Sequence, residues 1–306
     1  MKKNRNLILL LAIFLVLVGI YFGLKSWNEN KDQREAEKAE EETIYVLEEQ
    51  EMTALSYTDG ESEMSFVRED DNWYYEGDKE IPMSYDAVES IADTIMSLTA
   101  VRELEDPDAL EDYGLTEPAY TIEYVADSEE NAVYVGNMAG ENYYLTVGDT
   151  GKVYTVTSEL ISSLVFDLAD VVDHDDVPSI GSGNLTQVDV TENGETVTYT
   201  EEDDLAQLAG GFGVLSLDTC ADYHVTEETL ADYGLDESDR ITATATYTTM
   251  NSDDETETNT FTVYIGDVTS DEYQYVMVEG SKLVYQVSTS VVGNMIVVSE
   301  EEVVEE

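Results

Sequence analysis

The side chains of this chain that could do chemistry are few, apart from its carboxylates. Its only histidines are His174 and His224, and its 69 Asp and Glu outnumber 13 Lys and Arg. The run from Asp173 to Asp176 (Asp-His-Asp-Asp) holds metal-ligand types, but consecutive residues of a linker rarely converge on one ion. His174 is expected at the end of a helix, where a cationic histidine is favourable. A metal site formed by the run from Asp173 to Asp176 is the alternative. His224 lies in a strand-like run, which indicates a structural, hydrogen-bonded histidine.

Cys220 is the only cysteine. A single thiol cannot form an intramolecular disulfide or the paired cysteines of a zinc or redox site. It follows the apolar stretch Val214–Leu217, where a free cysteine packs as a small apolar residue. We therefore expect a buried packing residue and not a nucleophile.

No catalytic motif stands out in the sequence. It contains no G-x-S-x-G, P-loop, H-E-x-x-H or complete EF-hand pattern. A glycosidase pair cannot be selected from so many carboxylates. Clusters at 106–112 and 253–255 offer oxygen ligands without EF-hand geometry, so we expect weak divalent-cation association at most. The sequence predicts no catalytic residue, no cofactor and no specific metal site.

The charge is very unevenly distributed. The formal net charge is −56, which excludes a nucleic-acid binder that works through Lys and Arg. Residues 1–42 hold seven basic and seven acidic residues, whereas the rest of the chain holds six basic and 62 acidic residues. The whole net charge therefore belongs to residues 43–306, where it favours solubility and repels anionic polymers.

The first residues predict a membrane anchor. Leu7–Leu24 is an uncharged run of 18 residues, preceded by Lys2, Lys3 and Arg5. A helix of this length reaches about 27 Å, close to the hydrocarbon thickness of a bilayer. No small-residue cleavage site and no cysteine follows, so we expect neither a cleaved signal peptide nor a lipoprotein. The basic N-terminus predicts that the following residues lie outside the cell.

Three short sequences occur twice, in the same order. Asp112–Leu115 (Asp-Tyr-Gly-Leu) returns 120 residues later, and Val133–Gly136 returns 130 residues later as Val-Tyr-Ile-Gly. Val153-Tyr154 returns 131 residues later. The ten extra residues fall at Asn251–Thr260, a polar stretch that predicts a long hairpin tip. These matches indicate two tandem copies of one unit.

The sequence therefore divides into six parts. A stretch with the Pro, Gly and Ser of a linker separates the two copies. The predicted parts are a membrane anchor at 1–27, a charged stalk at 28–43, a first repeat at 44–174, a linker at 175–183, a second repeat at 184–298 and an acidic tail at 299–306.

Each copy is predicted to combine an antiparallel strand meander with one or two packed helices, an α+β fold. In the first copy the expected strands are 54–58, 63–68, 72–75, 120–125, 132–135, 142–147 and 152–157. An amphipathic helix begins near Ser84, and a second, from Ser158, places Leu160, Leu164, Leu168 and Val171 on one stripe. A short helix is expected between the cap Asp106 and Gly114, and its counterpart between Thr226 and Gly234. Gly136 and Gly266 are expected to end strands as turn residues.

These residues resemble a known family. The Tyr-Gly-Leu-x-x-Pro element at Tyr113–Pro118, Val135-Gly136, Tyr143-Tyr144 and Val153–Val156 are similar to the domain of unknown function 4340 family. The resemblance covers both copies, and the second copy departs from this pattern, with Ser238 where the first has Pro118. The resemblance implies an α+β extracytoplasmic domain without established activity. It also implies a context beside auxiliary components of gliding-type ABC transporters.

We expect a non-catalytic, single-pass membrane protein with its domains outside a bacterial cell, serving as an accessory or interaction subunit of the envelope. The lack of disulfides favours a Gram-positive bacterium. The expected partners are the membrane and an envelope or transporter protein. The alternative is a binding module for cell-wall glycan or divalent cations, suggested by the 21 tyrosines and the carboxylates. An envelope hydrolase is the third hypothesis.

Overall fold

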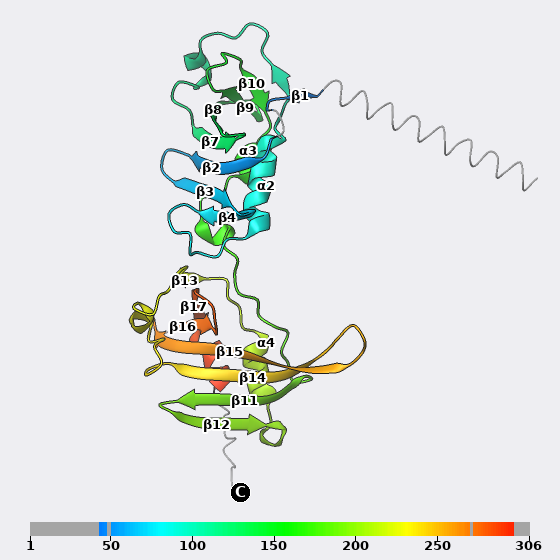
Figure 1. Ribbon diagram of the computed structural model, residues 1–306, viewed down its shortest axis with the longest axis vertical. Helices are drawn as coiled ribbons and strands as arrows, with labels where there is room; N and C mark the ends of the chain where they lie inside the picture. The colour runs from blue at the N-terminus through cyan, green and yellow to red at the C-terminus, as the bar shows by residue number, and fades with distance from the viewer. Residues whose placement is uncertain (1–42, 48–49, 270–271, 297–306) are drawn as a thin grey trace, which may run out of the picture. The chain divides into compact units, whose positions relative to one another are not determined.

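The computed structural model describes residues 43–47, 50–269 and 272–296 (Figure 1). The predicted anchor, all of the predicted stalk except Thr43, and the acidic tail lie outside the described residues. Within the described part, no helix is both long and apolar enough to cross a membrane.

Two large sheets carry most of the regular structure. One has eight strands in the order β4-β3-β2-β7-β8-β9-β10-β6, and the other has seven in the order β12-β11-β14-β15-β16-β17-β13. β1 and β5 form a separate pair. The strands are β1 Ile44–Tyr45, β2 Met52–Thr58, β3 Glu63–Glu69, β4 Asn72–Tyr75, β5 Thr99–Ala100, β6 Arg102–Glu103, β7 Tyr120–Ala126, β8 Glu129–Ala139, β9 Asn142–Val147, β10 Tyr154–Val156, β11 Leu185–Glu192, β12 Glu195–Thr200, β13 Cys220–Asp222, β14 Ile241–Met250, β15 Thr256–Val268, β16 Tyr273–Val278 and β17 Val284–Ser288.

The helices are few and short. The α-helices are α2 Tyr85–Met96, α3 Glu159–Ser163, α4 Ala206–Gly213 and α5 Thr289–Ile296, and the 3-10 helices are η1 Leu110–Tyr113, η2 Leu168–Asp170, η3 Glu201–Asp203 and η4 Leu230–Tyr233. Helix α2 confirms the helix expected from Ser84, and Val88, Ile91 and Ile95 form its buried face. The mixed composition confirms the α+β class.

Close contacts group the chain into two compact units. Among the described residues, unit 1 combines those up to Gln50 with Thr94–Thr121 and Ala132–Ile161, and unit 2 combines Glu51–Asp93, Ile122–Asn131 and those from Ser162 on. Each large sheet takes its strands from one predicted repeat. Residues 175–183 hold no helix or strand, and the domain boundary placed there stays a prediction.

One buried core of unit 2 lies between the seven-stranded sheet and two helices. Phe212 of α4 and Met295 of α5 lie in one buried cluster with Val188 and Val263 of the sheet. Ile81, from the segment between β4 and α2, belongs to the same cluster. This segment is therefore packed into the core of a sheet that begins about a hundred residues later in the chain.

Both large sheets hold a glycine against a short helix. Gly114 and Gly234 end η1 and η4 in the left-handed conformation, as the sequence predicts. A Cβ on Gly136 would lie 2.3 Å from the carbonyl oxygen of Tyr113. A Cβ on Gly266 would lie 2.1 Å from that of Tyr233. The prediction that Gly136 and Gly266 end strands is therefore wrong, because they lie inside β8 and β15, where the register shifts.

The predicted starts of the two short helices are also wrong. Helix η1 begins at Leu110 after Ala109, and not after Asp106, because the Tyr113 hydroxyl accepts the backbone N–H of Asp108 and keeps that stretch outside the helix. Helix η4 begins after Thr229. The carbonyl of Thr226 instead accepts the N–H groups of Thr229 and Leu230, which makes a turn before the helix.

Two longer predictions are shortened by competing hydrogen bonds. The helix expected from Ser158 ends at Ser163, and the Val165 carbonyl accepts the Tyr57 hydroxyl at 2.7 Å. In the polar hairpin, only Asn251–Glu255 forms the tip, because the Asn251 side chain accepts the N–H groups of Asp253 and Glu255. The residues from Thr256 on pair with β14.

Candidate functional site

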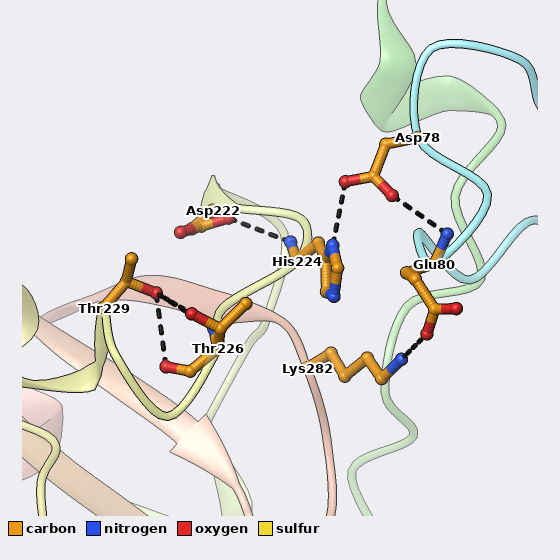
Figure 2. Close-up of polar contacts among 7 residues, drawn as sticks. All are labelled: Asp78, Glu80, Asp222, His224, Thr226, Thr229 and Lys282. Carbon is orange, nitrogen blue, oxygen red and sulfur yellow. Dashed lines mark hydrogen bonds and ion pairs between the residues drawn. The ribbon is translucent and has the colours of Figure 1, made fainter.

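His224 and four charged side chains gather around the segment between β4 and α2. Nδ1 of His224, which follows β13, lies 2.8 Å from Oδ2 of Asp78 (Figure 2). The backbone N–H of His224 donates to Asp222 at 2.9 Å. Lys282, just before β17, forms an ion pair with Glu80. These contacts join residues 146 and 202 positions apart in the sequence.

The electrostatics of this contact favour charged carboxylates. The hydrogen bond from His224, with that from the N–H of Glu80, lowers the pKa of Asp78. The ammonium group of Lys282 lowers the pKa of Glu80. Both carboxylates therefore stay ionised to lower pH than ordinary ones. Their contacts join the segment between β4 and α2 to residues near β13 and β17.

We predict that Asp78→Asn lowers the free energy of unfolding at pH 7 by about 0.5–1 kcal/mol, the usual value of a partly exposed pair. Because the pKa of Asp78 is lowered by folding, this contribution is present above the unfolded value of about 3.9 and is lost as the pH falls through the folded value. Urea unfolding of both chains across this range measures it. Asp254→Asn, in the exposed β14–β15 tip, is the matched control. A difference between Asp78→Asn and the wild type that is unchanged at low pH would contradict the prediction.

The structure does not bring the run from Asp173 to Asp176 together around one point. Oδ2 of Asp175 accepts the Ser281 hydroxyl at 2.6 Å and the Tyr285 hydroxyl at 3.0 Å. Nε2 of His174 lies 3.1 Å from the Ala169 carbonyl. The tyrosine is buried, and burial raises its pKa. Neighbouring side chains thus point to different partners.

Shallow hollows lie on either side of this run. One of about 530 Å³ is lined by Asp173–Asp176, Gly280–Leu283, Glu80 and Pro82. A second, of about 370 Å³, shares His174 and Asp175 and extends to Leu215–Asp218. Nowhere in the described part of the chain do three or more His, Cys, Asp or Glu side chains lie where they could hold a metal ion. The expected weak cation association at 106–112 and 253–255 stays a prediction.

Cys220 lies half-buried on β13. Its thiol donates to the carbonyls of Asp222 at 3.0 Å and Val284 at 3.3 Å. Burial raises the pKa of the thiol to about 11. A thiol with this pKa is protonated at neutral pH and is a poor nucleophile, in keeping with a packing role.

Arg102 differs from the other Lys and Arg of the described residues. Four of them, Arg68, Lys79, Lys152 and Lys282, form ion pairs with carboxylates. Arg240 lies over the ring of Tyr264, at 3.7 Å from its centre. Arg102 is exposed and lines a hollow of about 550 Å³ with Asn142, Tyr144 and Thr155. This hollow offers guanidinium, amide and hydroxyl groups beside an aromatic ring.

With this geometry in place, the class of the protein can be stated. It is a mixed α+β protein with two large sheets and short helices. Residues 73–207 match the model of a family described as a domain of unknown function (DUF4340). The match runs from β4 into α4 and confirms the resemblance of the first predicted repeat, whereas the resemblance of the second repeat stays a prediction. No curated protein and no solved structure matches the chain.

The sequence pattern did not indicate Asp78, Glu80 or Arg102. One signal was present: residues 43–306 contain only six Lys and Arg, and Lys152 and Lys282 both precede a Val-Tyr strand. In the structure each pairs with a carboxylate, Glu103 and Glu80 respectively. Because Lys and Arg are so scarce in residues 43–306, each such residue is a candidate partner for a carboxylate in the folded chain.

Proposed function

We propose that this chain is a non-catalytic interaction protein of the bacterial cell envelope. In this proposal, Leu7–Leu24 holds it in the membrane and the residues from 43 on lie outside. The observation that carries the proposal is the charge distribution around this uncharged run. Three basic residues precede it, and 62 carboxylates against six cations follow residue 42.

Exposed apolar side chains at equivalent places support binding as the role. Met138 and Val268 follow Gly136 and Gly266 by two residues, at the register shifts of β8 and β15. Their exposed fractions are 63% and 58%. In this proposal, these two side chains are contact points for another protein.

We also propose that the two sheets are tandem copies of one unit. Three features recur: a four-residue 3-10 helix ended by a left-handed glycine, a glycine against the carbonyl of its tyrosine, and a register shift just after that glycine. The recurrence of a backbone contact supports duplication more strongly than short sequence matches do.

Within this proposal, the partner is a component of an ABC-type transporter, which is the context that the family resemblance implies. The alternative role, binding of cell-wall glycan or divalent cations, stays a prediction. An enzymatic activity is not part of the proposal.

Cysteine labelling in intact cells tests the location. In a Cys220→Ser chain, Asp253→Cys is placed in the exposed β14–β15 tip, and Lys3→Cys is placed before the apolar run. A membrane-impermeant maleimide should label Asp253→Cys in intact cells and Lys3→Cys only after lysis. Labelling of Asp253→Cys only after lysis would overturn the proposal. Mild solubilisation that recovers the chain without any envelope protein would count against the interaction role.

A further inference from the structure

One edge of the seven-stranded sheet is an unprotected strand. β12 is its end strand, and no described strand lies beyond it. Its six residues pair with β11 in one unbroken register, from Glu195 opposite Glu192 to Thr200 opposite Gln187. The free N–H and C=O groups of such an edge are a template for another strand, so proteins usually shorten, bulge or charge their edges.

The other end strands of the two large sheets have such protection. β6 has two residues, and β4 has four. β13 has three residues, and its register shifts between Cys220 and Asp222. β12 is the longest of these end strands, and its last five residues read Thr-Val-Thr-Tyr-Thr, a sequence of high strand preference without proline or lysine.

The hairpin geometry shows which backbone groups face outward. Asn193 and Gly194 form a two-residue turn with φ values of 53° and 79°, as in a type I′ hairpin. In such a hairpin the flanking residues, Glu192 and Glu195, exchange the first backbone hydrogen bonds. The alternation of an antiparallel pair then directs the N–H and C=O groups of Thr196 and Thr198 away from β11. The N–H of Thr200 is used by Asp203 at 2.8 Å.

The charges around this edge indicate what it can bind. Five uncharged residues, 196–200, lie between Glu195 and Glu201. Glu192 and Glu195 flank one end of the strand, and the acidic residues 201–204 flank the other. Val197, at the centre, is 52% exposed. The complementary occupant has an apolar or hydroxyl-bearing centre and Lys or Arg at its ends.

Two other occupants are disfavoured by the same charges. A second copy of β12 would place Glu-rich ends against Glu-rich ends. The acidic residues 299–306 of this chain would do the same. Like charges on paired strands are destabilising.

We propose that β12 is the docking edge for an extended, basic-ended segment of a partner protein, which adds to this sheet as an eighth strand. The inference rests on the proposed interaction function and specifies how the partner binds. Main-chain hydrogen bonds to Thr196 and Thr198 supply affinity, and the acidic residues at both ends select the partner and set its position.

The test uses the full chain in detergent and a fluorescent peptide, Lys-Thr-Val-Thr-Val-Thr-Lys. We expect the peptide to bind and to slow amide exchange at Thr196 and Thr198. Thr198→Pro removes one outward N–H, a position where an edge strand tolerates proline. Losing that hydrogen bond should weaken the Kd about tenfold. Thr198→Val is the matched control, since it loses the same side-chain bond to Asp189 and keeps the N–H.

The outcomes separate this inference from the proposed function. Three results would overturn the inference. The first is equal binding of the peptide to Thr198→Pro and Thr198→Val, and the second is equal binding of a peptide with Glu in place of Lys at its ends. The third is a dimer of this chain formed through β12. Thr196→Pro repeats the test if Thr198→Pro does not fold. If an envelope partner is recovered from membranes equally by Thr198→Pro and by the wild type, the inference fails and the proposed function stands. If neither recovers a partner, the proposed function fails.

Discussion

Replacing Gly266 with alanine is expected to lower the free energy of unfolding by about 3 kcal/mol, the upper part of the usual range for an overpacked site. The added Cβ would lie 2.1 Å from the carbonyl oxygen of Tyr233, well inside van der Waals contact. The position of the Cβ is fixed by the backbone and the carbonyl oxygen is a backbone atom, so no side-chain rotation can relieve the clash. Either β15 must move away from η4, or the register of the sheet must change. Urea unfolding followed by circular dichroism measures the loss.

A glycine in open space provides the control. Gly293 lies in α5, and a Cβ added there would have no neighbouring atom within 4 Å. There, Gly293→Ala should stabilise the helix by up to about 1 kcal/mol, because alanine is the better helix former. Similar losses at Gly266 and Gly293 would show that the contact with Tyr233 is not the cause.

Gly136→Ala extends the test to the other sheet. Its added Cβ would lie 2.3 Å from the Tyr113 carbonyl, so a loss similar to that of Gly266→Ala is expected. A much smaller loss at one of the two glycines would weaken the proposal that the sheets are copies of one unit.

The sequence predicted the elements that depend on local patterns. The spacing of Val88, Ile91 and Ile95 is that of one helix face, and α2 lies where it was expected. The left-handed glycines at 114 and 234 also follow from their position at the end of a short helix that the sequence predicts. In these cases the residues that determine the structure lie within one or two turns of each other.

The predictions failed where a distant group competes for the backbone. The hydroxyl of Tyr57 donates a hydrogen bond to the carbonyl of Val165, 108 residues away in the sequence. The helix that begins after Ser158 ends before Val165. The pairing of His224 with Asp78 is equally remote. Nothing in the spacing of a sequence encodes such contacts, because they depend on how the elements pack.

The second large effect is expected at Phe212, and it also tests the domain boundary. Phe212→Ala should lower the free energy of unfolding by about 4 kcal/mol, as for other buried aromatic residues. The Phe212 side chain is 1% exposed and lies in the core between α4, α5 and the sheet. Val214→Ala, at a residue that is 62% exposed, should change stability by no more than about 0.5 kcal/mol. Urea unfolding of the two variants gives the comparison, and a small loss at Phe212 would contradict the prediction.

Hydrogen exchange of Phe212→Ala decides how far this core extends along the chain. Ile81 and Phe212 lie in one buried cluster, although the predicted boundary at 175–183 assigns them to different repeats. If unit 2 unfolds as one cooperative unit, the amides around Ile81 should lose protection from exchange together with those of β14 and β15. If only the residues from 184 on lose protection, the repeats unfold separately and the boundary predicted from the sequence is the energetic one. The difference arises because apolar residues of the first predicted repeat, among them Ile81 and Val172, lie in the core of the second, which a boundary drawn from composition cannot show.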